Sequence, residues 1–235
     1  MIQMKPFLVF LAALAFALSP LLSTGFNGFR PDQFPIPQIN APVQPAGYAF
    51  SIWGVIYLML IAGAGFGLLR RAGNVGWDTH RTPLILSLGI GAGWIPVAQL
   101  SAFWATVMIW LMLGTALFAL LRLPRIDRIW LRTPVALYAG WLTAASCVAL
   151  ALMLAGHGLT GATPSALLCL TLGLAIAATI QNLRPDIPEY SAAVIWALTG
   201  VALSNIEPFN PAVLTLCGVG ILALAGVVWR GRSTA

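Results

Sequence analysis

Eight long apolar segments dominate the sequence and constrain its fold more than any other feature. They cover about residues 6–24, 46–69, 83–100, 103–122, 134–155, 164–183, 190–205 and 210–229. A helix needs about 20 mostly apolar residues to cross a bilayer; the seventh segment is short, so we expect it to be tilted or partly buried by its neighbours. Only 8% of the residues are charged, whereas a soluble domain has about 25%. We therefore predict an all-α integral membrane protein with about eight helices.

Prolines mark where several of these helices begin. Pro45, Pro83, Pro134 and Pro164 stand at or near segment starts, where the missing N–H group costs no helical hydrogen bond. Pro96 lies inside the third segment, so we expect a kink there.

The basic residues predict the orientation of the helices. If the N-terminus is cytoplasmic, alternating loops place eleven of the twelve basic residues inside and leave only Arg30 outside. The eleven are Lys5, Arg70, Arg71, Arg81, Arg122, Arg125, Arg128, Arg132, Arg184, Arg230 and Arg232. This split follows the positive-inside rule and predicts that both termini are cytoplasmic. It also explains the net charge of +6 without a nucleic-acid partner. A cleaved signal peptide ending near Ala17 is the alternative for the first segment.

The first outside loop, residues 25–44, is the longest. It contains "PDQFPIPQINAPVQP" and is poor in charge, so we expect an extended and fairly stiff conformation. Loops of this length tend to be functional or disordered. Two interpretations of this loop remain: a lid over an outward-facing site, or a plain tether between two helices.

The usual catalytic constellations are missing from the sequence. Every acidic residue falls in a predicted loop, and His80 and His157 are loop residues without metal-ligand spacing. Because charges inside membrane helices mark proton and ion pathways, an ion-coupled pump is disfavoured. We expect a protein that is not an enzyme, with no metal site and no covalent cofactor.

The aromatic residues remain as candidates for a binding site. Of nine tryptophans, Trp77, Trp104, Trp130 and Trp229 lie near segment ends and suit an interfacial belt, whereas Trp53, Trp94, Trp110, Trp141 and Trp196 lie deeper. Trp53 and Tyr57 share a helix face at i, i+4, as Tyr138 and Trp141 do at i, i+3. A slot walled by indoles would suit a flat, mostly apolar ligand. Simple packing between helices is the alternative.

Three stretches resemble the tryptophan-rich sensory protein (TspO/MBR, translocator protein) family. "PAGYAFSIWGVIYLML" resembles the start of that family's second helix, where a proline-rich loop leads into a Trp with a Tyr four residues later. "GAGWIPVAQLSAFWATVMIWLML" resembles its third and fourth helices, and "TPVALYAGWLTAAS" its fifth. The last three segments are similar to those of longer bacterial relatives.

The resemblance implies a TspO-like five-helix bundle over residues 1–155 and additional transmembrane helices over 156–235, in one membrane domain. It implies binding of a porphyrin, haem, another tetrapyrrole or a sterol-like molecule under the first loop, pairing as homodimers, and a bacterial plasma membrane location. The ligand-binding residues that it implies are Pro45, Tyr48, Trp53, Tyr57, Trp94, Tyr138 and Trp141.

Two departures from the family pattern suggest a drier slot. Gly91 stands where the family usually has Asn before the third-helix Trp, and Ala149 stands where it has Asn late in the fifth helix. The function expected is a membrane receptor or carrier for a planar hydrophobic ligand, with a sensory or transport role. The alternatives are a structural or assembly protein without a small ligand and a photochemical enzyme that degrades a tetrapyrrole.

Overall fold

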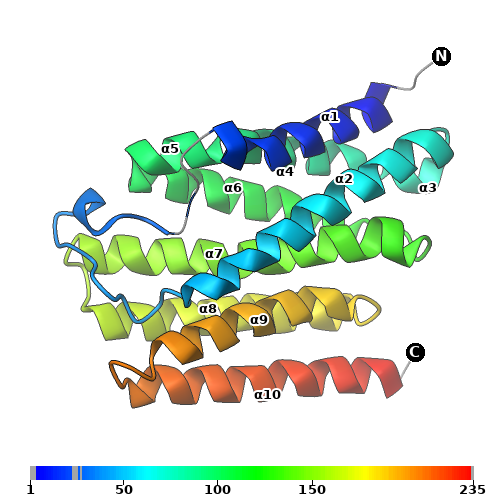
Figure 1. The fold of residues 1–235 in the computed structure, drawn as a ribbon. Coiled ribbons are helices and arrows are strands. Elements are labelled where there is room, and N and C mark those ends of the chain that lie inside the picture. The colour runs from blue at the N-terminus through cyan, green and yellow to red at the C-terminus, as the bar shows by residue number, and fades with distance from the viewer. Residues whose placement is uncertain (1–3, 23–25, 27, 234–235) are drawn as a thin grey trace.

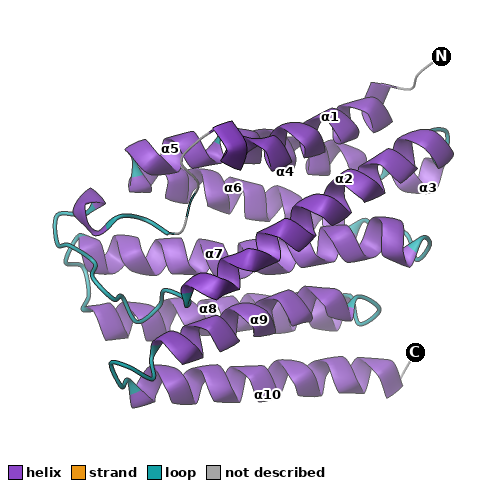
Figure 2. Cartoon of the chain, viewed as in Figure 1, coloured by secondary structure: helices purple, strands orange, loops and turns teal. Residues whose placement is uncertain are grey.

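The structure is a computed structural model and describes residues 4–22, 26 and 28–233. The described residues form helices joined by loops, with no strand among them (Figure 2). The helices are α1 (Met4–Leu18), α2 (Ile52–Arg70), α3 (Val75–Asp78), α4 (Arg81–Ala92), α5 (Trp94–Leu100), α6 (Ala102–Leu121), α7 (Thr133–Gly156), α8 (Ala162–Leu183), α9 (Pro188–Ser204) and α10 (Pro211–Ser233). Short 3-10 turns, η1 (Ser19–Leu22), η2 (Pro31–Gln33) and η3 (Gly47–Ser51), and one π-helical turn, η4 (Arg128–Arg132), connect them.

The long helices lie side by side as a bundle with α7 at its centre (Figure 1). α7 packs against α6, α8 and α9, and also against α2. Its span is 72% buried inside the protein, whereas the other spans are 22–44% buried. The outer helices therefore expose apolar side chains that a bilayer would cover. α1 begins and α10 ends at the same end of the bundle (Figure 1).

The expected all-helical membrane architecture is confirmed. In the described part of the chain, six helical stretches are long and apolar enough to cross a bilayer, and α3–α4 with α5 would make a seventh. The seventh stretch is bent by 41° at the break before Trp94. The break lies close to Pro96, where a kink was expected because proline has no backbone N–H group. The remaining predicted segment is α9, which has 17 residues.

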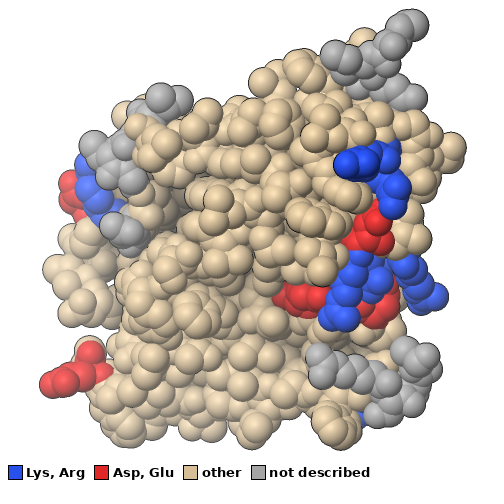
Figure 3. Space-filling model, turned by 45° about the vertical axis from the view of Figure 1, so that its right-hand side comes forward, with Lys and Arg blue, Asp and Glu red and all other residues tan. Residues whose placement is uncertain are grey.

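The charged residues separate to the two ends of the bundle. Figure 3 shows Lys and Arg gathered together with Asp and Glu at one end of the visible face, and a broad uncharged band beside them. We call this end the basic end; it carries the basic residues predicted to be cytoplasmic, although the side chain of Arg232 lies outside the described part of the chain. Ion pairs tie it together, including Lys5 Nζ–Asp78 Oδ2 at 2.6 Å and Arg128 Nε–Glu189 Oε1 at 2.8 Å.

Two arginines at the basic end also hydrogen-bond carbonyl groups at the end of a helix or directly after it. Arg184 Nη1 donates to the Leu120 carbonyl at 2.6 Å. Arg81 donates to the carbonyls of Arg71 and Ala72 at 2.7 and 3.0 Å, just after α2. A helix leaves its last carbonyls without partners, and the guanidinium groups supply the missing donors.

One predicted belt residue, Trp77, is buried instead. Trp104, Trp130 and Trp229 are exposed, but only 3% of Trp77 is. Its Nε1 donates to Asp127 Oδ2 at 2.9 Å, and Arg71 pairs with the same carboxylate at 2.8 Å. The Arg71 hydrogen bond holds the pKa of Asp127 below its ordinary value. The belt prediction was wrong here because a loop carboxylate satisfies the indole nitrogen inside the protein.

Candidate functional site

A cavity bounded largely by aromatic rings lies beside the start of α2, at the end of the bundle opposite the basic end. We call it the aromatic cavity, and its volume is about 350 Å³. This falls within the range of about 300–1,000 Å³ for small-molecule sites. Its walls come from α1, η3 and α2 on one side and from α5, α6 and α7 on the other. They include Phe16, Tyr48, Phe50, Trp53, Tyr57 and Trp94.

The rings of Trp53 and Tyr57 form a stacked pair along one face of α2. Their centroids are 5.2 Å apart and their planes differ by 14°. The ring of Phe16, from α1, meets both edge-on, at 5.6 Å from Trp53 and 5.1 Å from Tyr57. Gly91 makes room for Phe16, because a Cβ atom at this position would lie 2.7 Å from the phenyl ring. The space that an Asn side chain would take at position 91 is therefore occupied by the Phe16 ring.

Tyr138 and Trp141, from α7, support this pair from behind. The Tyr138 ring is fully buried and meets Phe16 edge-on at 5.5 Å. Its hydroxyl lies 2.9 Å from Ser87 Oγ, which itself donates to the Met112 carbonyl. Because that hydroxyl already has a partner, it is not available to a ligand.

The Trp141 indole is also buried, with 2% of the residue exposed, and meets the Trp53 ring edge-on at 6.1 Å. Among the described residues its Nε1 has no hydrogen-bond acceptor. Trp94 differs, because its Nε1 donates to the Ala105 carbonyl at 2.8 Å. The two buried indoles near the cavity thus differ in whether their donor is free.

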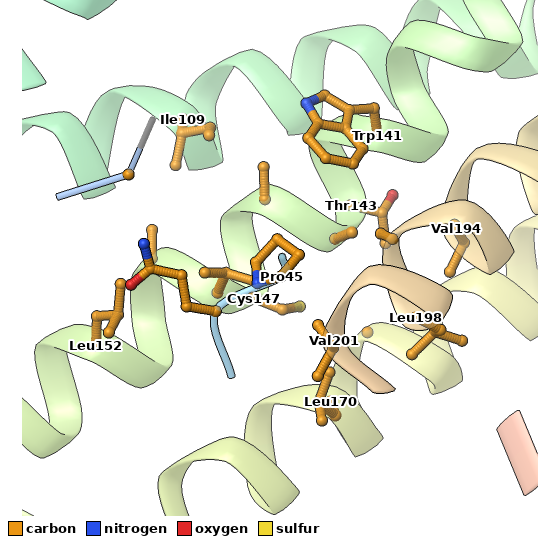
Figure 4. Close-up of a pocket in the computed structure, with 18 of the residues that line it drawn as sticks. Pro45, Ile109, Trp141, Thr143, Cys147, Leu152, Leu170, Val194, Leu198 and Val201 are labelled. Carbon is orange, nitrogen blue, oxygen red and sulfur yellow. The ribbon is translucent and has the colours of Figure 1, made fainter. Parts of the chain in front are cut away.

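A second cavity lies between α6, α7, α8 and α9 (Figure 4). We call it the inner cavity; its volume is about 70 Å³. Aliphatic side chains such as Leu152, Leu170 and Val201 form most of its wall. The Thr143 hydroxyl at its edge already donates to the Ala139 carbonyl and contacts the Tyr190 hydroxyl at 2.8 Å. Among the described residues, four line both cavities and lie between them: Phe26, Phe50, Trp94 and Ile109.

The proline-rich loop covers this end of the bundle and is fastened to three helices. Gln33 Nε2 donates to the Ala98 carbonyl at 2.8 Å, and the Ile36 N–H donates to the Gly156 carbonyl at 2.9 Å. Asn205 Nδ2, at the end of α9, donates to the Pro42 carbonyl at 2.7 Å. The loop therefore crosses the ends of α5, α7 and α9 and is packed against the bundle; we call it the lid.

The structure distributes the seven predicted ligand-binding residues around these two cavities. Tyr48, Trp53, Tyr57 and Trp94 line the aromatic cavity, and Pro45, Trp94 and Trp141 line the inner cavity. Tyr138 lines neither cavity and contacts the site only through other rings. Tyr48 stands at the rim, 43% exposed, and its ring meets that of Trp196 edge-on.

Sequence reasoning did not select three phenylalanines that the structure places at the site. Phe16 comes from α1, Phe26 from the lid and Phe50 from the turn before α2. The glycine at position 91 is the one signal that could have indicated Phe16, because a bulky partner fits opposite a residue without a side chain. The described residues contain no cluster of His, Cys, Asp or Glu that could hold a metal ion.

Comparison with known proteins identifies one family. The family model of TSPO-like proteins matches residues 7–229, which is nearly the whole chain and includes α8 and α9. No curated protein and no solved structure matches.

Proposed function

Since the chain belongs to the TSPO-like protein family, we propose that it is a membrane receptor or carrier that binds a planar, largely apolar molecule such as a porphyrin in the aromatic cavity. The observation that carries this proposal is the cavity itself, because it lies directly beside the stacked Trp53–Tyr57 pair. If the deep indoles served only for packing between helices, they would interdigitate and leave no such space.

The chemistry of the cavity wall favours a flat ligand of low polarity. Aromatic rings prefer edge-on or offset contacts with one another, and the walls offer ring edges and faces from three directions. None of the described residues that line the cavity is Lys, Arg, Asp or Glu. A charged group on the ligand would lose its hydration there without a partner, so we expect such groups to remain at the rim beside Tyr48 and Ser51.

The lid and the charge distribution support an opening on the non-cytoplasmic side. The aromatic cavity lies at the end opposite the basic end, which the positive-inside rule assigns to the cytoplasm. On this assignment both termini are cytoplasmic and the ligand enters beneath the proline-rich loop. We further propose a bacterial plasma membrane as the location, as the family resemblance implies.

Intrinsic tryptophan fluorescence, titrated with protoporphyrin IX in lipid nanodiscs, tests the proposal. We expect saturable quenching, and a 2- to 10-fold weaker affinity in Trp53→Leu, because one aromatic contact contributes about 0.5–1.5 kcal/mol beyond its buried area. Trp104→Leu is the matched control, since this indole is 61% exposed and does not line the cavity. Equal affinity in wild type, Trp53→Leu and Trp104→Leu would refute the proposed site.

A further inference from the structure

The inner cavity is separate from the space that a planar ring would fill. It is formed largely by α8 and α9 packed on α7, where Leu170, Gly173 and Leu198 are among the lining residues. Gly173 allows α8 to pack closely on α7, because a Cβ atom there would lie 3.2 Å from Cys147 Sγ. The cavity therefore depends on the helices that follow α7.

The wall of the inner cavity is suited to a hydrocarbon. Among the described lining residues, the side chains that carry a polar atom are those of Gln44, Trp94, Trp141, Thr143 and Cys147. The Trp94 Nε1 and the Thr143 hydroxyl are already engaged by other partners. Apolar cavities of this kind stay free of water and accept apolar groups. A carboxylate would lose its hydration there, so a charged side arm does not fit.

The size of the inner cavity corresponds to a short chain. A cavity needs about 10–15 Å³ for each water-sized group, so 70 Å³ accommodates about five to seven such groups. One isoprene unit has five carbon atoms. The cavity thus has room for roughly one such unit.

The two cavities adjoin each other through the partition of Phe26, Phe50, Trp94 and Ile109. We propose that the ligand is a planar ring carrying an apolar chain, with the ring in the aromatic cavity and the first five or so carbons of the chain in the inner cavity; this rests on the proposed function. The chain passes between the partition side chains.

Trp141 gives the junction of ring and chain a polar contact. Its Nε1 has no acceptor among the described residues, and in Figure 4 the nitrogen lies on the side of the indole nearer Ile109, a partition residue. An ester or ether oxygen at the root of the chain accepts this hydrogen bond. The site therefore selects a ligand whose chain is attached through oxygen over one that bears a free acid.

The proposal is tested by comparing the affinities of three protoporphyrin IX monoesters that differ in chain length: the methyl, prenyl and farnesyl esters. Titrations use tryptophan quenching in nanodiscs, with empty nanodiscs subtracted to remove partitioning into lipid. Each buried CH₂ group contributes about 0.8 kcal/mol, which is about 4-fold in affinity. The prenyl ester has four more carbons than the methyl ester, so we expect at least a tenfold gain. The farnesyl ester should gain little more, because the cavity is then full.

Matched leucine substitutions on α9 locate the chain. Ala197 is buried and lines the inner cavity, whereas Ala192 lies on the exposed face of the same helix. Ala197→Leu should reduce the prenyl gain to 2-fold or less and leave the affinity for the methyl ester unchanged. Ala192→Leu should retain the full gain. Should Ala197→Leu fail to fold, Leu170→Ala enlarges the cavity and should increase the gain from farnesyl over prenyl.

Three results would overturn the proposal in different ways. Equal affinity for methyl and prenyl esters would remove the chain site and leave the proposed ring site standing. A prenyl gain that persists in Ala197→Leu, or a farnesyl gain unchanged in Leu170→Ala, would place the chain elsewhere. If neither protoporphyrin IX nor any ester binds, the proposed function fails and this inference fails with it.

Discussion

Two side chains at the end of α9 contribute to holding the lid closed, and their removal should increase its opening by a predictable amount. Ser204 Oγ donates to the Gln44 carbonyl and Asn205 Nδ2 to the Pro42 carbonyl, each at 2.7 Å. A hydrogen bond of this kind contributes about 0.5–1.5 kcal/mol. The double variant Ser204→Ala/Asn205→Ala therefore loses about 1–3 kcal/mol of lid closure, which raises the population of the open lid about 5- to 150-fold.

Hydrogen exchange measured by mass spectrometry reads this population directly. The Gln44 and Ala46 N–H groups donate to the Ala41 and Gly200 carbonyls in the closed lid, so their exchange should accelerate by the same 5- to 150-fold factor. Peptides from the centre of α7 should exchange as in wild type, because a local opening leaves the core intact. Porphyrin should also associate and dissociate faster.

Asn210→Ala is the matched control at the same end of the bundle. Asn210 Nδ2 donates to Thr163 Oγ1 at 3.0 Å, and its Oδ1 accepts from the Val213 N–H at the start of α10. None of these contacts involves the lid, so lid exchange should remain at the wild-type rate. Unchanged lid exchange in the double variant, or equal acceleration in Asn210→Ala, would refute the view that these two bonds hold the lid closed.

Three further predictions concern the basic end and the aromatic cavity. Asp127→Asn should lower the midpoint of thermal unfolding at pH 7, because Arg71 holds the pKa of this carboxyl below its ordinary value. Stability from a depressed carboxyl pKa is present above the unfolded-state pKa and is lost as pH falls through the folded-state pKa, so the difference in midpoint between wild type and variant should shrink below about pH 4. A difference in midpoint that stays constant with pH would contradict this prediction. Gly91→Asn should lower the unfolding free energy by about 1–3 kcal/mol through overpacking against Phe16, and Phe16→Ala should lower it by about 3–5 kcal/mol. In chemical denaturation the double variant should lose less unfolding free energy than the sum of the two single losses, whereas additive losses would argue against this contact. Tyr138→Phe should cost about 0.5–1.5 kcal/mol of unfolding free energy for one buried hydrogen bond and leave the protoporphyrin affinity unchanged; a large loss of affinity would mean that the hydroxyl reaches the ligand.

The helices were predictable because each depends on local features of the sequence. Long apolar runs set the spans, prolines mark their starts, and Pro96 lies next to the 41° break. The burial of Trp77 was not predictable, because its partner Asp127 is 50 residues away and belongs to a loop. A hydrogen bond from an indole N–H to a carboxylate far along the chain is a tertiary contact, and it leaves no local pattern in the sequence.

The candidate site was predictable only in part, for a similar reason. Trp53 and Tyr57 share a helix face by periodicity, so their pairing follows from spacing alone. The Phe16 ring joins them from another helix, and the inner cavity depends on how α8 and α9 pack on α7. Helical periodicity gives the face of a residue, but it does not say which neighbour meets that face.

The guanidinium groups that close helix ends have a consequence for how this protein can be changed. Arg81 and Arg184 hold backbone carbonyls with a planar fork of donors, which a lysine ammonium cannot reproduce. Exchanging them for lysine would preserve the signal read during insertion into the membrane and yet weaken the assembled bundle. A redesign that moves the positive charges to reverse the orientation of the protein in the membrane would therefore also remove the hydrogen bonds that Arg81 and Arg184 make to these carbonyl groups.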